Sequence, residues 1–345
     1  MQLNVQRSDN LSSKYILQDR FQRRVTYMRV SLIEHCNYAC TYCMPAQGWE
    51  KKAAKELLSF DEIIEIIEVM SQRGLSKVRF TGGEPLLRKN LADLIERVHA
   101  IPSIQKIALT TNGHLLTKQI PSLMKAGLNQ LNVSVDTFNT HTFDHVTRGG
   151  KLDQVLDGIR TAQAYGMKAI KLNAVLTTDI EQNVEQWIDF CQQSWDLNCL
   201  PRWIEVMPMG NGLIDQNHVN NQKVLQKLTP HFHLEPASST PSVNGPARYW
   251  QVTQGKYLGH QIGFINPMSD DGFCSTCNRI RLSATGQLRA CLADDRSVDL
   301  RSVLRMGLHG PALMPFIESA LYGKDNAHHM HLGKFPQTPM THVGG

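Results

Sequence analysis

The sequence predicts an α/β protein built as a partial (β/α)6 barrel of the TIM type, followed by a smaller C-terminal region. Three observations support this fold class. Apolar, β-branched segments alternate with helical segments over roughly 200 residues, which favours a parallel sheet. Most positions in those segments are apolar, as in strands that are covered on both faces. Polar or glycine-rich residues follow the segments, where barrel enzymes carry their active sites.

Local signals give the boundaries of the elements. A capping box from Ser59 to Glu62 begins the first helix, whose isoleucines recur at helical spacing up to Met70, and Gly74 follows its end. The predicted strands cover residues 25–33, 77–81, 104–110, 130–136, 168–176 and 201–206. The later helices are expected at 90–100, 117–126, 152–165 and 182–192.

The ends of the predicted strands carry the residues that suggest a shared active site. They are a cysteine-rich loop, Gly82-Gly83-Glu84, Thr110-Thr111-Asn112, Ser134 with Asp136, and Met207-Pro208. A barrel brings all of these to one mouth. A flavodoxin-like sheet is the alternative, and it would gather ligands at one crevice instead.

Three regions are predicted along the chain: an N-terminal leader at 1–24, the barrel at 25–222 and a C-terminal region at 223–345. Two stretches rich in Gly, Asn, Pro and Ser, at 208–222 and 236–247, interrupt the alternation. Short strands are expected beyond them, and then a helix over about 297–306. The histidines at 328, 329 and 331 either bind a metal or belong to a polar chain end.

The composition is that of a soluble protein from a reducing compartment. The net charge is +5 and 41% of the residues are hydrophobic. No apolar run is long enough for a membrane span, the N-terminus lacks the apolar core of a signal peptide, and no run rich in Lys and Arg appears. The eight cysteines are clustered, as metal ligands are. We expect a cytoplasmic protein that binds an anion, and neither nucleic acid nor a membrane.

The first cysteine cluster consists of Cys36, Cys40 and Cys43, spaced C-x3-C-x2-C with no fourth cysteine nearby. Zinc sites usually have four ligands, often in C-x2-C pairs, whereas iron–sulfur clusters are held by cysteine sulfur. Three thiolates on a [4Fe–4S] cube leave one iron open for a substrate or cofactor. The alternative is a buried trio of small apolar side chains.

The second cysteine cluster consists of Cys274, Cys277 and Cys291. A predicted hairpin with strands at 279–283 and 287–291 returns the third cysteine to the other two. These three thiols again predict a [4Fe–4S] cluster with an open iron. Zinc is the alternative, with its fourth ligand from a histidine or from one of the two remaining cysteines, Cys191 and Cys199.

Basic residues within the predicted strands require an anionic partner. Lys77 and Arg79 are two residues apart and share a face, and Arg279 and Arg281 repeat this spacing. Buried cations are costly unless they are paired. A triphosphate would account for them, because arginine forks match phosphate oxygens. Ion pairs with acidic residues at the strand ends, such as Glu84, are the alternative.

The first cluster, with Tyr42 before its last cysteine, resembles the signature of the radical S-adenosylmethionine (SAM) enzymes. The resemblance implies a barrel of the radical SAM type. It also implies that the open iron chelates SAM, and that one electron cleaves SAM to methionine and a 5′-deoxyadenosyl radical.

Both clusters together, with the final Gly344-Gly345, resemble the family of GTP 3′,8-cyclases of molybdenum cofactor biosynthesis, from about Arg29 to the C-terminus. The resemblance implies conversion of GTP to (8S)-3′,8-cyclo-7,8-dihydro-GTP. It also implies that the open iron of the second cluster binds guanine and that the Gly-Gly tail inserts toward the active site.

The same resemblance assigns binding residues. For GTP they are Arg29, Arg79, Thr110, Lys171, Arg279, Ile280 and Arg281. For SAM they are Tyr42, Gly83, Ser134 and Met207. The implied partners are a one-electron reductant such as flavodoxin and, through the product, cyclic pyranopterin monophosphate synthase. The protein is expected to be a monomer or a homodimer.

Two other functions remain open. A peptide-modifying radical SAM enzyme would use its extra cluster as an electron relay. That function predicts four cysteine ligands for the extra cluster and no paired arginines. A non-enzymatic iron–sulfur or zinc protein that binds nucleic acid would need surface basic residues interleaved with aromatic ones.

Overall fold

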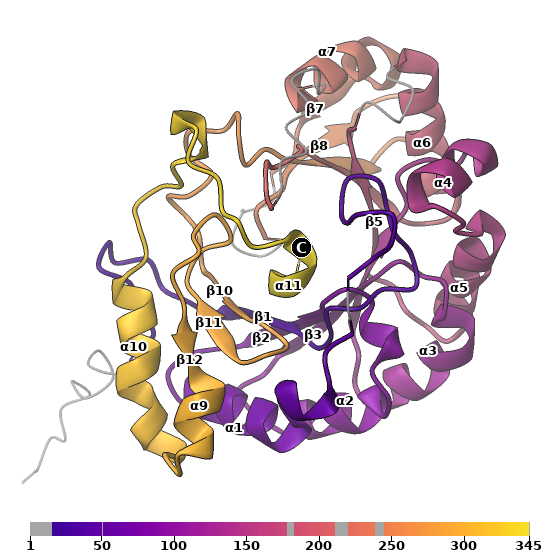
Figure 1. Ribbon diagram of the computed structural model, residues 1–345. Coiled ribbons are helices and arrows are strands. Elements are labelled where there is room, and N and C mark those ends of the chain that lie inside the picture. Colours follow the sequence, from indigo (N-terminus) through magenta and orange to yellow (C-terminus); the bar gives the residue numbers. More distant parts are fainter. Residues whose placement is uncertain (1–15, 50, 178–182, 211–219, 239–244, 345) are drawn as a thin grey trace, which may run out of the picture.

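One curved sheet of twelve strands forms the centre of the molecule, and helices cover its outer face (Figure 1). The computed structural model describes residues 16–49, 51–177, 183–210, 220–238 and 245–344. The six strands expected for the barrel are β1 Tyr27–Ser31, β2 Lys77–Thr81, β3 Lys106–Thr111, β4 Gln130–Ser134, β5 Ile170–Val175 and β6 Leu200–Ile204. The expected helices are α1 Phe60–Ser71, α2 Leu91–His99, α3 Leu116–Lys125, α5 Leu152–Ala164 and α6 Val184–Asp196.

The strand order confirms the predicted partial barrel. β1 to β6 are neighbours in sequence order and all pair in parallel. The C-terminal region adds one further parallel strand at each edge: β10 (Arg279–Leu282) pairs with β1, and β9 (Gln261–Ile265) pairs with β6. The order of the described strands is linear, so the barrel stays open between β9 and β10.

Antiparallel strands extend both edges of the parallel sheet. They are β7 Leu234–Pro236 and β8 Arg248–Val252 beyond β9, and β11 Gln287–Arg289 and β12 Val298–Asp299 beyond β10. The hairpin predicted around Gly286 is therefore confirmed. The helix expected over about 297–306 is shorter than predicted, and α9 spans Leu300–Arg305. It begins later because the two residues before it form β12, which pairs with β11.

Four α-helices of the described chain were not predicted: α4 Thr140–Thr147, α7 Asn221–Phe232, α10 Met314–Tyr322 and the short α11 Met340–Val343. α4 contains three threonines, which are poor helix formers, and its N-cap Asn139 accepts a hydrogen bond from Thr142. α7 contains Pro230 within its last turn, which reads as a helix breaker in a sequence. Tertiary packing outweighs these local signals. None of the described helices is both long and apolar enough to cross a bilayer.

Part of the expected leader is packed into the fold. Asp19 and Arg23 are buried and form an ion pair of 2.6 Å, and the Arg23 guanidinium also binds the backbone ahead of β10. The limits 1–24, 25–222 and 223–345 stay predictions.

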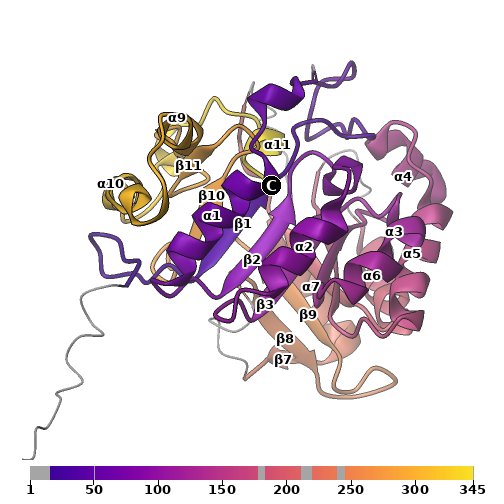
Figure 2. The same ribbon diagram turned by 90° about the horizontal axis from the view of Figure 1, so that it is seen from below.

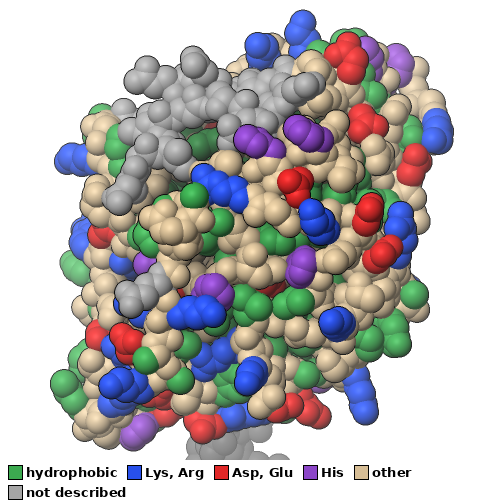
Figure 3. Space-filling model, turned by 45° about the vertical axis from the view of Figure 1, so that its right-hand side comes forward, with side chains coloured by type: hydrophobic (Ala, Val, Ile, Leu, Met, Phe, Trp, Pro, Cys, Tyr) green, Lys and Arg blue, Asp and Glu red, His purple; other side chains and the backbone are tan. Residues whose placement is uncertain are grey.

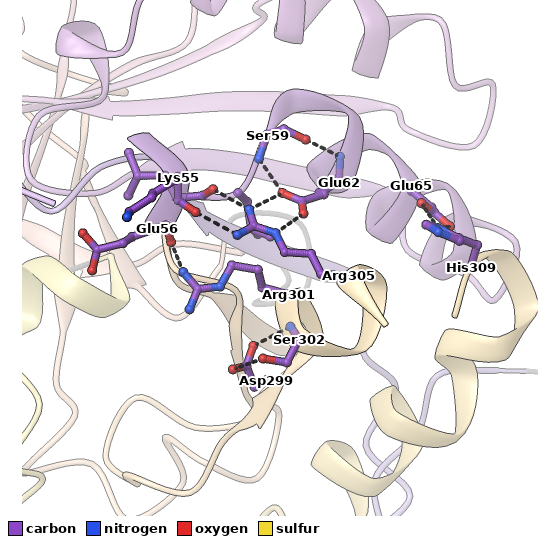
Figure 4. A network of polar contacts seen from close by, with 12 residues as sticks. Lys55, Glu56, Ser59, Glu62, Glu65, Asp299, Arg301, Ser302, Arg305 and His309 are labelled. Atoms are coloured by element: carbon purple, nitrogen blue, oxygen red, sulfur yellow. Dashed lines mark hydrogen bonds and ion pairs between the residues drawn. The ribbon is translucent and has the colours of Figure 1, made fainter. Parts of the chain in front are cut away.

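α9 and α10 lie beside α1 at one edge of the sheet (Figure 2). Arg305 at the end of α9 forms an ion pair of 2.8 Å with Glu62 in the first turn of α1. The same guanidinium donates to the carbonyls of Lys55 at 2.7 Å and Leu57 at 3.1 Å (Figure 4). These contacts attach the C-terminal region to the segment between the first cysteine cluster and α1.

We expect Arg305→Met to lower the free energy of unfolding by about 1 kcal/mol and to speed amide exchange over residues 54–58. The variant loses the hydrogen bonds to the Lys55 and Leu57 carbonyls and the ion pair with Glu62. Arg160→Met is the matched control, because the Arg160–Asp157 pair is exposed on both sides and its loss should change stability by only a few tenths of a kcal/mol. Chemical denaturation and hydrogen exchange measure both effects. Equal stability of the two variants would contradict the role given to Arg305.

Candidate functional site

The first cysteine cluster lies in the loop after β1. Cys36, Cys40 and Cys43 line one cavity, together with residues at the C-terminal ends of the barrel strands. The sulfur of Cys36 accepts hydrogen bonds from the Tyr38 amide at 3.4 Å and from Asn112 Nδ2 at 3.6 Å. Burial raises the pKa of Cys36 to about 11 and that of Cys43 to about 12. The free thiols are thus protonated, and binding of iron must displace these protons.

The cavity has a volume of about 220 Å³ and is lined by all four residues expected to contact SAM: Tyr42, Gly83, Ser134 and Met207. Thr110, from the expected GTP set, lines it as well. At Gly83 an added Cβ would lie 2.2 Å from the carbonyl oxygen of His35, so a side chain has no room there. The predicted SAM residues and the first cysteine cluster therefore meet in one place.

The buried carboxylate of Glu205 lines this cavity, and two more, those of Glu84 and Asp136, bond to residues that line it. Glu84 accepts hydrogen bonds from the backbone amides of Leu86 and Asn112 and from the hydroxyl of Thr111. Asp136 accepts one from the Tyr42 hydroxyl at 2.8 Å and one from the Val175 amide at 2.9 Å. Burial raises the pKa of Glu84 to about 7 and that of Asp136 to about 6. Neither forms an ion pair with an arginine of the described chain, so the alternative partner for the barrel cations is wrong.

The pairing of β10, β1 and β2 aligns four of the predicted GTP residues in rows, namely Arg29, Arg79, Arg279 and Arg281. Arg29 on β1 is the register partner of Arg79 on β2 and of Arg281 on β10. In the row two residues earlier, Tyr27 stands between Lys77 and Arg279. Because residues two apart point to the same face of a strand, both rows share one side of the sheet.

Lys171 of β5 and Arg202 of β6 complete this group of cations. Burial, followed by Arg202 and Lys77, lowers the pKa of Lys171 to about 6. Burial also lowers the pKa of Lys77 to about 8. Arg202 is 4% exposed and donates to Asn173 Oδ1 at 3.0 and 2.6 Å. Sequence reasoning missed Arg202, although a lone arginine inside an otherwise apolar strand was a usable signal.

Arg79 shows what holds these side chains in the absence of an anion. Its Nε donates to the Tyr27 hydroxyl at 2.5 Å, and its Nη1 donates to the Thr110 hydroxyl at 3.0 Å. Although burial opposes it, the neighbouring Arg79, Arg29 and Lys77 lower the pKa of Tyr27 to about 7. In the part of the chain that the structure describes, neither Arg79 nor Arg281 forms an ion pair with Asp or Glu. These two buried guanidiniums thus have no acidic partner among the described residues and fit a polyanion.

The C-terminal tail enters the barrel. Helix α11, Met340–Val343, lies inside the ring of strands (Figure 1), and its first two residues line the cavity. Arg281 donates to the carbonyls of Val343, at 3.1 Å, and Gly344. At Gly344 the φ angle is +72°, and an added Cβ would lie 2.3 Å from Thr81 Cγ2. Gly345 lies outside the described residues.

The second cysteine cluster lies at the β10 edge of the sheet. Cys274 and Cys277 precede β10, and the β10–β11 hairpin returns Cys291 close enough to interact electrostatically with both. Although burial opposes it, Arg279 and Lys324 lower the pKa of Cys277 to about 6. The two cysteine clusters thus differ in their charged surroundings.

Of the remaining candidate ligands, the two other cysteines lie away from this cluster, whereas His328 and His329 line one cavity with Cys291. Cys191 in α6 and Cys199 before β6 are buried, and strands β1 to β5 all lie between β6 and β10. His328 contacts the Pro267 carbonyl at 2.6 Å and His329 pairs with Asp325, while the side chain of His331 is outside the description.

The surface differs from the interior in its charge pattern. On the face shown in Figure 3, basic and acidic side chains are interspersed. Among the buried cations of the described residues, Arg79, Arg202 and Arg281 form no ion pair with a carboxylate, and all three lie on the strands.

Comparison with known proteins gives the same assignment. The family model of the radical SAM superfamily matches residues 30–191, and the model named Molybdenum Cofactor Synthesis C matches residues 201–330. The GTP 3′,8-cyclase of Moorella thermoacetica is 37% identical over 330 residues, which cover 95% of this chain and 100% of that protein. The GTP 3′,8-cyclase of Hydrogenovibrio crunogenus is 38% identical over 339 residues, covering 95% and 99%.

Solved structures support the fold. SuiB of Streptococcus suis with bound S-adenosylmethionine superimposes with a TM-score of 0.59 at 13% identity, covering 81% of this chain and 64% of that one. Native anSMEcpe with bound AdoMet gives a TM-score of 0.58 at 14% identity, covering 87% of this chain and 81% of that one. With an N-terminal radical SAM barrel, a C-terminal molybdenum cofactor synthesis region and relatives matched over nearly their whole length, the chain belongs to the GTP 3′,8-cyclase family of radical SAM enzymes.

Proposed function

We propose that this protein converts GTP to (8S)-3′,8-cyclo-7,8-dihydro-GTP, the first step of molybdenum cofactor biosynthesis. The observation that carries the proposal is the position of the cation group, on the same barrel strands whose ends form the cavity with the first cysteine cluster. A triphosphate held by the cations places the ribose toward the cavity. Enzymes of this kind accelerate the reaction chiefly by holding the reacting atoms in contact.

In this proposal Cys36, Cys40 and Cys43 hold a [4Fe–4S] cluster, which supplies the electron that cleaves SAM when both are bound. Tyr42, Gly83, Ser134 and Met207 surround SAM. Gly83 lets backbone groups approach its methionine moiety, and the Asp136–Tyr42 hydrogen bond fixes the aromatic ring beside the cysteines.

GTP is bound by Arg29, Arg79, Thr110, Lys171, Arg279, Ile280 and Arg281, to which we add Lys77 and Arg202. The arginines give the triphosphate charge-assisted hydrogen bonds that no described carboxylate supplies to Arg79, Arg202 or Arg281. Thr110 lines the cavity and also contacts Arg79, so it marks the junction between the two ligands.

A second [4Fe–4S] cluster is bound by Cys274, Cys277 and Cys291, and its open iron takes guanine. Among the described residues, no three His, Cys, Asp or Glu side chains converge closely enough to hold one metal ion. A cubane does not need this convergence, because each thiolate binds a different iron. The set of three cysteines, with no fourth cysteine near it in the sequence, favours a cluster over zinc.

The reductant is a one-electron donor such as flavodoxin, and the product passes to cyclic pyranopterin monophosphate synthase. The oligomeric state, monomer or homodimer, stays a prediction. A direct test of the proposal is anaerobic incubation with GTP, SAM and a reductant, followed by mass analysis of the nucleotide. Unchanged GTP beside cleaved SAM would contradict it.

Alanine at all three cysteines of either cluster should remove about four iron ions and four sulfides per chain. Loss of the first cluster should abolish SAM cleavage, because the electron has no route to the sulfonium. Loss of the second should abolish cyclisation while leaving some SAM cleavage. Cys199→Ala is the control, since this buried cysteine belongs to neither cluster. Equal loss of SAM cleavage in both folded triple variants would rule out this division of roles.

Gly344→Ala should greatly lower cyclisation while both clusters and the fold persist, because the new Cβ collides with Thr81 and displaces the tail from Arg281. Gly333→Ala is matched to it: its φ angle is +73°, but an added Cβ meets nothing within 4 Å. Both variants carry a backbone strain of about 1 kcal/mol, and only the first carries the collision. If the two variants cyclise GTP at the same rate, the tail has no part in the site.

Binding of GTP should take up protons between about pH 7 and pH 8. With a pKa of about 6, Lys171 is mostly neutral in the free enzyme, and a neighbouring triphosphate raises that pKa again. Calorimetry in buffers of different ionisation enthalpy measures the uptake. Lys171→Met should reduce it by nearly one proton, whereas Lys168→Met, at an exposed position, should leave it unchanged. Uptake should also fade below about pH 5, where Lys171 is already charged.

A further inference from the structure

We infer that Lys324 is a positioning residue for the second cysteine cluster, donating to the sulfur of Cys277 and raising the reduction potential of the iron–sulfur group bound there. The inference rests on the proposed function, which assigns a [4Fe–4S] cluster to Cys274, Cys277 and Cys291. It concerns a residue after α10 that no sequence motif singled out.

The ammonium of Lys324 is fixed by three acceptors at the start of β10. Its Nζ lies 3.4 Å from Cys277 Sγ, 3.5 Å from the Cys277 carbonyl and 3.0 Å from the Arg279 carbonyl. The residue is 2% exposed. A lysine side chain loses much rotamer freedom when it is buried, so the contacts must compensate for that loss and for the lost hydration.

The sulfur is the anionic partner that this buried cation requires. In the described part of the chain, no Asp or Glu forms an ion pair with Lys324. The adjacent Asp325 carboxylate is instead engaged by Arg20 at 2.9 Å and by Arg296 at 2.5 Å. The two carbonyls hold the ammonium in place but carry no charge. The thiolate of Cys277 is the group that neutralises it.

A separate contact fixes the backbone on both sides of this interaction. Arg23, paired with Asp19, donates to the Cys274 carbonyl at 2.9 Å. It also donates to the carbonyls of Asp325 and Asn326, each at 2.6 Å. One buried guanidinium therefore joins the cysteine loop to the segment that carries Lys324, so their relative position does not depend on a bound ligand.

In the described structure, the first cysteine cluster has no cation in the position that Lys324 takes at the second. Cys36 Sγ accepts from an amide side chain and a backbone N–H, and the buried carboxylates Glu84 and Asp136 lie near its loop. Arg148 binds this loop, but through the carbonyls of Ala39 and Met44. Among the described residues, no Lys or Arg donates to a sulfur of the first cluster.

A cation at the second cluster, and none at the first among the described residues, should give the two clusters different reduction potentials. Gaining an electron makes a cluster more negative, so a hydrogen-bonded cation at a ligating sulfur stabilises the reduced form and raises the potential. The effect is strong where water is excluded, as it is around Lys324. The cluster beside Lys324 then does not compete as a reductant with the one that must reduce SAM.

The test is a potentiometric EPR titration of the full chain after anaerobic reconstitution, with Cys36, Cys40 and Cys43 all replaced by Ala so that only the second cluster contributes. Lys324→Met should lower the equilibrium constant for reduction of the second cluster at least tenfold. For a one-electron couple this is a fall of 59 mV or more in midpoint potential. Lys324→Arg keeps the charge and should stay within about threefold of the parent. Lys125→Met, at an exposed position, is the surface control and should not shift the potential.

An unchanged midpoint in K324M would overturn the inference, as would equal shifts in K324M and K324R. Iron and sulfide contents are measured in parallel. Loss of the cluster from both Lys324 variants would overturn it too, because a purely steric role then suffices. Loss from K324M alone would support the need for a charge at the sulfur. If the parent itself binds no cluster, the proposed second cluster fails, and the inference fails with it.

Discussion

Mutual repulsion among Arg29, Arg79 and Arg281 is overcome by the backbone hydrogen bonds of three parallel strands, and the rest of the site depends on this balance. The strand register forces these side chains to be neighbours, whatever their charges. Burial then lowers the pKa of Arg29 to about 10 and that of Lys171 to about 6. A site of this kind stores unfavourable electrostatic energy in the free enzyme, and a polyanion releases it on binding.

The tail uses the same arginines for a second purpose. Arg281 binds the carbonyls of Val343 and Gly344, so one guanidinium connects the chain terminus to the cation group. The cavity wall formed by Met340 and Thr341 therefore depends on residues that are nearly sixty positions away in the sequence. If Arg281 also binds GTP as proposed, substrate binding and the seating of the tail are coupled through one guanidinium.

Local sequence patterns were sufficient to predict the parallel barrel and the hairpin. They also predicted that Tyr42, Gly83, Ser134 and Met207 lie together near the first cysteine cluster. Strand ends and cysteine spacing are short-range signals, and parallel topology converts them into positions. The attachment of β9 and β10 to opposite edges was not predictable, because pairing between strands distant in sequence leaves no periodic trace. Lys324 was missed for the same reason, because its partners lie on another element, 47 and 45 residues away in the sequence.

The parallel pairing of β10 with β1 also has a consequence for biosynthesis. These strands are some 250 residues apart in the chain, so β1 has an unpaired edge for most of translation. A nascent chain that has emerged only as far as β6 contains the whole first cysteine cluster, yet it lacks the wall that carries Arg279 and Arg281. At that stage the chain has all three cysteines of the first cluster but none of the second, so the two proposed cluster sites are completed at different times.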